Sequence, residues 1–218
     1  MIISPDTNYV KFGGDDYGSV GAPLAVVPRG SKTFYEVIFK KDVSGRSQGC
    51  SRIGWVTTTC KISDQSNQRG CTDVGYCEHS YAFDGQNQVK YHAGNINPWG
   101  SKFEASGDRV LGVAVDMQNG QLLYGLDGNW APPMGCAFQI DTNVNVYPAL
   151  SGRDVELDVN FGESDFVFGP PDPSFEKLCD VVACRADDDQ GPGHTTERGR
   201  GGGAHGGRGG QRGRAGKR

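Results

Sequence analysis

The sequence predicts an all-β fold, an antiparallel β-sandwich followed by a short helix and a tail without fixed structure. Short runs of β-branched and aromatic residues recur between turn residues. No helical periodicity of any length appears before residue 170. The final stretch, 190–218, contains 12 glycines and almost no apolar side chain, too little to offset the entropy of ordering. The 218 residues therefore suffice for one folded domain and a tail.

Eight segments are predicted to be strands. In the last of them, Val155, Leu157 and Val159 alternate with Asp154, Glu156 and Asp158, which is typical of an antiparallel strand with one face in water. Residues 33–40 alternate in the same way. In chain order the segments are 33–40, 51–57, 80–85, 88–92, 109–117, 121–128, 144–151 and 154–161.

The segment 107–127 predicts a central hairpin. The pair Asn119-Gly120 tolerates the positive φ angles of a type I′ turn and stands between two apolar strands. The run Val113, Ala114 and Val115 is apolar without alternation, so we expect this strand to be buried on both faces.

The chain is predicted to divide into three regions: the sandwich domain over 1–170, a short helix and acidic linker over 171–189, and an Arg/Gly-rich tail over 190–218. Asp172 as the cap and Pro173 at the first helical position favour a helix start there. Residues 1–189 carry 15 Lys and Arg against 25 Asp and Glu, hence −10, whereas 190–218 carry 7 against 1, hence +6.

Loop order predicts a binding rim. In an up-and-down run of strands, successive connections lie at alternate ends of the sandwich. Counting the connections from the strand at 33–40 places most of the long ones at the same end, which we call the rim. Long loops on a rigid scaffold commonly carry recognition. Trp and Arg are frequent at interface hot spots, although both Trp side chains fit equally well a role in covering the core. The rim comprises 28–32, 58–78, 93–106, 128–136 and 151–153, with candidates Arg29, Arg69, Trp99, Asn129, Trp130 and Arg153.

A series of motifs in order and spacing resembles the SPRY domain. The stretch "HSYAFDG" is similar to the subclass found in ryanodine receptors and ubiquitin-ligase scaffolds, and the resemblance covers about residues 1–170. The matching stretches are "FYEVIF", "IGWVT", "DVGYCEHSYAFDG", "KYHAG", "GDRVLGVAVDMQNGQLLYGLDGNW", "MGCAF", "YPALS" and "VELDVNFG".

This resemblance implies a bent, concanavalin A-like sandwich that has no catalytic activity and binds peptides or protein surfaces through loops on one rim. Family members that hold a peptide often use the loop after the "IGWVT" strand and the turn before the last long strand. Those positions correspond to Gly75 and Tyr76, and to Ser151, Gly152 and Arg153.

The residues predict no enzyme, cofactor or metal site. There is no nucleophile elbow, phosphate-binding loop or H-E-x-x-H motif, and Asp154, Glu156 and Asp158 are spread along one strand rather than converging on a calcium ion. The seven cysteines are odd in number and irregularly spaced, so we expect mostly reduced thiols. Without a leader or membrane span, the sequence predicts a soluble, monomeric protein of the cytosol or nucleus.

The tail predicts a contact with single-stranded RNA, because guanidinium groups pair with phosphates and glycine leaves the backbone free to follow a strand. The candidates are Arg198, Arg200, Arg208, Arg212 and Arg214. Two alternatives to a protein-binding module stay open. In one, RNA is the main ligand and the sandwich a passive carrier. In the other, the protein is a lectin, with Trp130 beside Asp127 and Asn129 at a sugar site.

Overall fold

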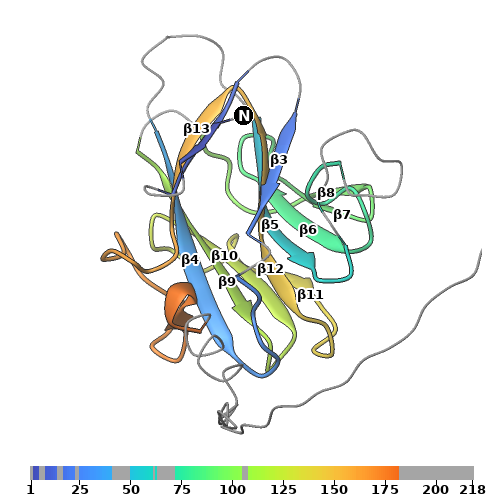
Figure 1. Ribbon diagram of the computed structural model, residues 1–218, viewed down its shortest axis with the longest axis vertical. Coiled ribbons are helices and arrows are strands. Elements are labelled where there is room, and N and C mark those ends of the chain that lie inside the picture. The colour runs from blue at the N-terminus through green and yellow to red at the C-terminus, as the bar shows by residue number, and fades with distance from the viewer. Residues whose placement is uncertain are drawn as a thin grey trace, which may run out of the picture.

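The structure is a computed structural model that describes residues 2–4, 8–13, 17–22, 25–40, 50–60, 62, 72–104 and 108–181. Two mainly antiparallel sheets pack face to face, with the last described segment lying along one side (Figure 1). The predicted all-β sandwich is confirmed. In the part that the structure describes, no helix is long and apolar enough to cross a bilayer.

Sheet A contains eight strands within the described residues, and β14 joins it by running parallel to β4. The order across the sheet is β1 (Ile2–Ser4), β2 (Tyr9–Phe12), β13 (Val155–Asn160), β4 (Lys32–Phe39), β9 (Val110–Asp116), β10 (Gln121–Leu126) and β11 (Gly135–Gln139), with β14 at Glu176–Lys177.

Sheet B contains six strands within the same described part of the chain. Consecutive strands pair as hairpins from β5 to β8, while β12 returns from the end of the chain to lie between β3 and β5. The order is β3 (Gly18–Gly21), β12 (Val146–Arg153), β5 (Cys50–Thr57), β6 (Ser80–Asp84), β7 (Val89–His92) and β8 (Asn95–Pro98).

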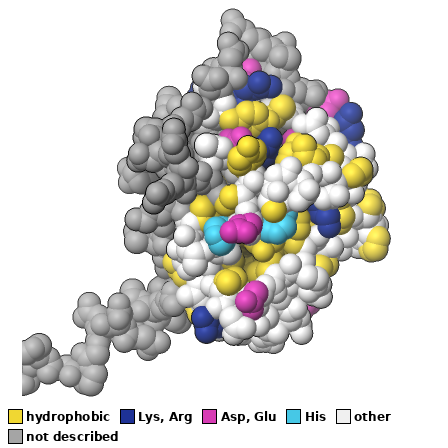
Figure 2. Space-filling model, turned by 90° about the vertical axis from the view of Figure 1, so that its right-hand side faces the viewer, with side chains coloured by type: hydrophobic (Ala, Val, Ile, Leu, Met, Phe, Trp, Pro, Cys, Tyr) yellow, Lys and Arg dark blue, Asp and Glu magenta, His cyan; other side chains and the backbone are white. Residues whose placement is uncertain are grey.

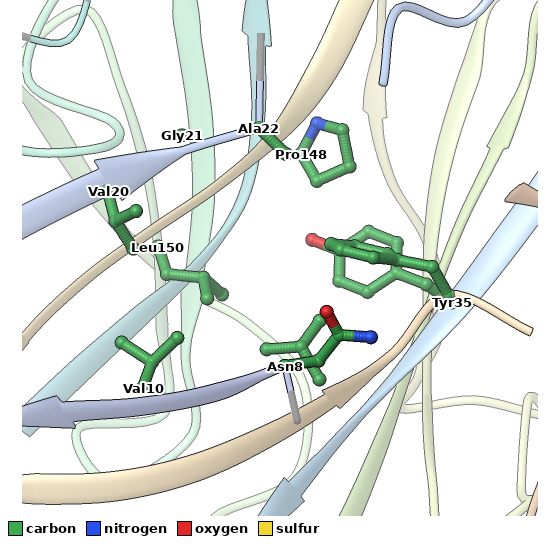
Figure 3. A pocket seen from close by; sticks show the side chains of 10 residues that line it. Asn8, Val10, Val20, Gly21, Ala22, Tyr35, Pro148 and Leu150 are labelled. Carbon is green, nitrogen blue, oxygen red and sulfur yellow. The ribbon is translucent and has the colours of Figure 1, made fainter. Parts of the chain in front are cut away.

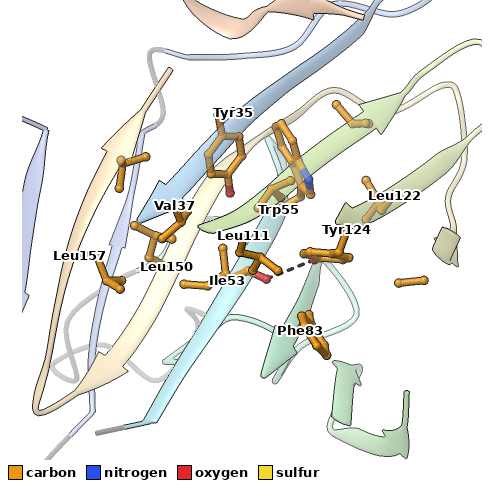
Figure 4. Packing of buried hydrophobic residues seen from close by; sticks show 14 of the residues in the cluster. Tyr35, Val37, Ile53, Trp55, Phe83, Leu111, Leu122, Tyr124, Leu150 and Leu157 are labelled. Carbon is orange, nitrogen blue, oxygen red and sulfur yellow. Dashed lines mark hydrogen bonds between the residues drawn. The ribbon is translucent and has the colours of Figure 1, made fainter. Parts of the chain in front are cut away.

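Large aromatic side chains fill the space between the sheets and tie them together (Figure 4). The hydroxyl of Tyr35 in β4 donates to the carbonyl of Gly54 in β5 at 3.0 Å, and Tyr124 in β10 donates to Ile53 at 3.1 Å. Trp55, also fully buried, lies edge-on to Tyr35 at 5.2 Å between ring centroids. Both phenols are therefore satisfied by the opposite sheet, and burial raises the pKa of each, which keeps them neutral.

The predicted hairpin is confirmed, with β9 buried at every position, but the predicted type I′ turn is wrong. Within the turn only Gly120 has a positive φ, 65°. The Asp116 carboxylate instead accepts the backbone N–H groups of Gln118 and Asn119, both at 2.9 Å. The same pattern recurs at 84–88, where a carboxylate caps the turn between β6 and β7. In both turns the residue with positive φ, Gly120 or Gln88, comes four positions after the aspartate whose carboxylate caps the turn.

The predicted single rim is also wrong, because the strand β8 lies inside the segment 93–106 that the sequence suggested as one loop. One additional strand reverses the end at which every later connection falls. The amide of Met117 consequently donates to Ser31 at 2.9 Å, which brings the 117–120 turn to the end where 28–32 lies. The connection after β10 and the β12–β13 turn lie at the opposite end, where Asp127 donates to Val110.

The segment after β13 differs from the predicted helix starting at Pro173. Asp172 caps a turn by accepting the Ser174 amide at 2.8 Å, β14 follows, and the helical turn begins only at Leu178. Phe175 and Leu178 are buried against sheet A. Pairing with β4 thus takes the place of the first helical turns, and the linker and tail from 182 onward lie outside the described residues.

Candidate functional site

The structure separates the predicted rim residues into two groups. Five of them, Gly75, Tyr76, Ser151, Gly152 and Arg153, belong to β12 and to the segment 72–79, which meet at the outer face of sheet B. The others lie elsewhere on the sandwich. Arg29 is exposed in the loop before β4, and Trp99, Asn129 and Trp130 follow β8 and β10. Arg69 and the tail arginines Arg198, Arg200, Arg208, Arg212 and Arg214 lie outside the described residues.

Trp99 and Trp130 both pack on buried clusters, Trp99 on the core between the sheets and Trp130 on a smaller cluster at the outer face of sheet A. The Trp99 ring stands perpendicular to Phe83 at 5.1 Å between centroids. The Trp130 ring lies on the outer face of sheet A over two glycines of neighbouring strands, Gly112 and Gly125, where any Cβ would stand 2.6 Å from the indole. The Trp130 ring is therefore seated in a slot of the sheet, which weakens the lectin alternative that relied on it.

The segment 72–76 is fastened across the outer face of sheet B by one buried hydroxyl. Ser151 Oγ accepts the amide of Val74 at 2.8 Å and lies 2.8 Å from Ser19 Oγ, which donates to the carbonyl of Thr72. Next in the chain, Gly75 adopts φ 90°, and a Cβ there would meet the Cβ of Tyr91 at 2.3 Å. Ser151 and Gly75 thus position the loop, whereas Gly152 faces Phe12 and Val155 beneath the surface.

Arg52 lies at the centre of this face. Its guanidinium stacks on the Tyr91 ring at 4.1 Å and on the Tyr17 ring at 5.0 Å, and it pairs with Asp73 at 3.4 Å. The Nε atom is buried and has no hydrogen-bond partner among the described residues. Its side chain is only 16% exposed, so two aromatic rings and one carboxylate hold this charge rather than water.

The guanidinium group of Arg153 reaches the Tyr17 ring, which Arg52 also contacts. Arg153 lies 5.5 Å from the centroid of the Tyr17 ring and contacts Cys50. Burial raises the pKa of the Tyr17 and Tyr91 phenols, with Arg52 opposing the rise at both, so neither ring carries charge at neutral pH. The arrangement therefore presents neutral hydroxyls and two cations side by side.

Exposed apolar side chains border these cations. Tyr76 is 63% exposed, and Ile96 is 60% exposed on β8, directly opposite Tyr91 of β7. The backbone of Gly94 donates to Gly75, so the β7–β8 turn lies beside the loop. Figure 2 shows hydrophobic side chains gathered around charged ones in the upper part of this face. We call the whole set the Arg52 surface: Tyr17, Arg52, Asp73, Tyr76, Tyr91, Ile96 and Arg153.

Sequence reasoning missed Tyr17, Arg52 and Tyr91. Tyr17 precedes a strand, β3, that carries no alternation, and Arg52 was assigned to a strand without a role. The available signal was the position of Arg52 in a strand whose neighbours Ile53 and Trp55 face the core, which places the charge on the outer face. The identity of its ring partners depends on pairing between distant segments.

The described residues contain no group of three or more His, Cys, Asp or Glu that could hold a metal ion. A pocket of about 140 Å³ opens between the edges of the sheets (Figure 3), with only Asn8 and the Tyr35 hydroxyl as polar side-chain groups. Its lining consists of Asn8, Val10, Val20, Gly21, Ala22, Tyr35, Pro148, Leu150, Val159 and Phe161.

The cysteines depart in part from the expectation of reduced thiols. Cys50, Cys136 and Cys179 carry free thiols, as expected, but Cys77 forms a disulfide. Burial raises the pKa of Cys136 and of Cys179, which disfavours the nucleophilic thiolate at neutral pH.

Comparison with known proteins agrees with the fold. The relatives that align with this chain include the ATP-dependent RNA helicase Ddx1 of Drosophila melanogaster (27% identical, covering 65% of this chain and 17% of the relative) and the ATP-dependent RNA helicase DDX1 of Xenopus laevis (27%, 60% and 16%). They also include the E3 ubiquitin-protein ligase RKP of Arabidopsis thaliana (28%, 63% and 10%). The alignments thus span less than a fifth of each relative. The sequence pattern of the SPRY domain matches residues 32–164, which is more than half of the chain and includes the strands β4 to β13. The chain therefore belongs to the SPRY domain family, whose domains are protein-interaction modules.

Proposed function

We propose that this protein binds an extended segment of a partner protein on the Arg52 surface. The observation that carries the proposal is the coincidence of exposed apolar side chains, Tyr76 and Ile96, with the ring-stacked cation Arg52 on one rigid face. Aromatic residues and arginine dominate the energetics of protein interfaces, because they bury large areas at low entropic cost. Membership of a family of protein-interaction modules supports the same conclusion.

The geometry suggests how a segment is held. The loop 72–76 is fixed through Ser151, so its exposed Tyr76 needs little further ordering when a ligand arrives. The face between β7–β8 and Arg153 is long enough for several residues of an extended chain. Apolar ligand side chains pack against Tyr76 and Ile96, and polar ligand groups accept hydrogen bonds from the guanidinium groups.

Hydrogen exchange on the full chain tests whether peptides bind at the Arg52 surface. Peptides selected from a random display library against the immobilised protein serve as probes. Bound peptide is expected to slow exchange in 72–79 and 89–98 and to leave 163–169, on the opposite sheet, unchanged. Protection confined to sheet A, or to the loops around Arg29 and Trp130, would contradict the proposed location.

A second function, contact with single-stranded RNA, is favoured by the composition of the tail. Arg200-Gly201-Gly202 and Arg208-Gly209-Gly210 are strict Arg-Gly-Gly repeats. Six net charges on a single strand give a log–log salt slope near −4, a loss of roughly 300-fold between 50 and 200 mM salt. Crosslinking of RNA to the full chain and to a variant with the tail arginines changed to Gln tests it, since crosslinks that persist in the variant exclude the tail as the contact.

A further inference from the structure

A strip on the opposite side of the molecule exposes apolar and acidic side chains together. Residues 163–168 cross the outer side of sheet A, in the orange part of the chain in Figure 1. Val167 is 55% exposed and Phe168 is 53% exposed, and Glu163 and Asp165 are exposed beside them. We call 163–168 the acidic-aromatic strip. Contiguous exposed apolar side chains that are rimmed by polar ones are typical of interaction sites.

Backbone hydrogen bonds hold the strip in place, so its exposed side chains cannot turn inward to be buried in the core. The buried carboxylate of Glu36 accepts three backbone N–H groups, from Val167 at 2.7 Å, Phe168 at 2.9 Å and Gly169 at 3.0 Å. Phe166 packs inward on a buried ring of β4, Phe34, with 4.2 Å between centroids. Phe166 is anchored and the following amides are bonded, so Val167 stays exposed, and the Phe168 ring lies over Gly128 of the turn after β10 while about half of the residue remains open to solvent.

The segment that contains the strip and the tail that follows it carry opposite net charges. Residues 163–180 contain five acidic side chains and one basic one, a net charge of 1 − 5 = −4. Residues 190–218 contain seven basic and one acidic side chain, a net charge of +6. Guanidinium groups pair with carboxylates and stack on aromatic faces, and the glycines around each arginine allow the backbone to follow a surface closely.

We propose that the arginine-glycine tail of this chain docks on its own acidic-aromatic strip. The tail arginines lie 17 to 33 positions beyond Val181, an r.m.s. span of about 23–32 Å for a glycine-rich chain, which is enough to return to the strip. Such a tether gives the tail an effective concentration on the order of 1 mM, so a contact too weak to matter between molecules is populated within one.

Docking gives the tail two competing states, one on the strip and one available to an outside ligand. Because the contact depends on exposed charges, salt that screens them releases the tail. Any polyanion that binds the arginines must first displace the strip, which lowers its apparent affinity by the fraction of tail that is docked. This regulation is independent of ligand binding on the Arg52 surface.

Amide NMR of the full chain tests the proposal at 50 and 500 mM salt. The wild type is compared with a variant in which Arg198, Arg200, Arg208, Arg212 and Arg214 are changed to Gln, and with a second in which they are changed to Lys. Amide resonances of 163–169 are expected to shift between the wild type and the Gln variant at 50 mM salt and to coincide at 500 mM. The Lys variant keeps the charge but loses stacking, so an intermediate shift is expected.

Ring-current shifts supply the reciprocal observation. Tail arginine Nε–H resonances stacked on Phe168 are expected upfield in the wild type and at random-coil positions in Phe168→Ala, which removes an exposed ring and keeps the fold. Identical strip amides in the wild type and the Gln variant at 50 mM salt would overturn the proposal, as would tail-dependent shifts located elsewhere on the domain.

Discussion

Among the charged side chains of the described residues, Glu36 is expected to contribute most to the free energy of unfolding. Its carboxylate accepts three N–H groups between 2.7 and 3.0 Å and fixes the strip on sheet A. Hydrogen bonds to charged groups contribute about 1.5–3 kcal/mol each, and the loss is partly offset where the freed amides reach water. We expect Glu36→Ala to lower the free energy of unfolding by about 3–5 kcal/mol.

The variant Glu36→Gln separates geometry from charge. A Gln oxygen can still accept from Phe168 and Gly169, but its NH₂ group faces the donor of Val167. We expect a loss of about 1.5–3 kcal/mol, which corresponds to a Tm lower by roughly 4–10 °C for a domain of this size. Urea denaturation supplies the free energies, with the exposed Glu104→Gln as control. A Glu36→Gln loss equal to that of the control would refute the reasoning.

Two further predictions concern other buried contacts. Gly125→Ala places a Cβ 2.6 Å from the Trp130 ring and is expected to cost about 1–3 kcal/mol in thermal unfolding, whereas an unchanged Tm would mean that the ring is not confined to its slot. The pKa of Asp116 is lowered, because hydrogen bonds from Asn119 and the turn amides together with Lys32 outweigh the opposing effect of burial. Its stabilising contribution is therefore present above pH 3.8 and is lost as the pH falls from there through the lowered pKa of the folded protein. Wild type and Asp116→Asn should differ in unfolding free energy at pH 7, and a difference that does not shrink as the pH falls below 3.8 would contradict this.

Local pattern was sufficient for the elements in which one face meets the core. The alternation of Val155, Leu157 and Val159 predicted β13, and the unbroken apolar run predicted the buried β9. It failed at β8, because Asn95–Pro98 is exposed at every position and leaves no apolar period to detect. That one strand reversed the order of the later loops and divided the predicted rim.

The candidate site was predictable only in part, for a related reason. The resemblance to the SPRY domain supplied Tyr76 and Arg153, which lie where segments distant in sequence converge on sheet B. The ring partners of Arg52 come from β7 and from the residue before β3, and no local pattern specifies that meeting. The slot for Trp130 likewise needs two glycines placed opposite each other by strand pairing.

The most direct test of the account compares two exposed aromatic residues on opposite faces of the full chain. Tyr76 lies on the Arg52 surface and Phe168 on the strip, and they are exposed to a similar extent, so neither truncation is expected to unfold the protein. Fluorescence polarisation with display-selected peptides at 150 mM salt should give at least tenfold weaker binding for Tyr76→Ala and unchanged binding, within twofold, for Phe168→Ala. Equal affinities for wild type and Tyr76→Ala, or a loss confined to Phe168→Ala, would contradict the assignment of the Arg52 surface as the protein-binding face.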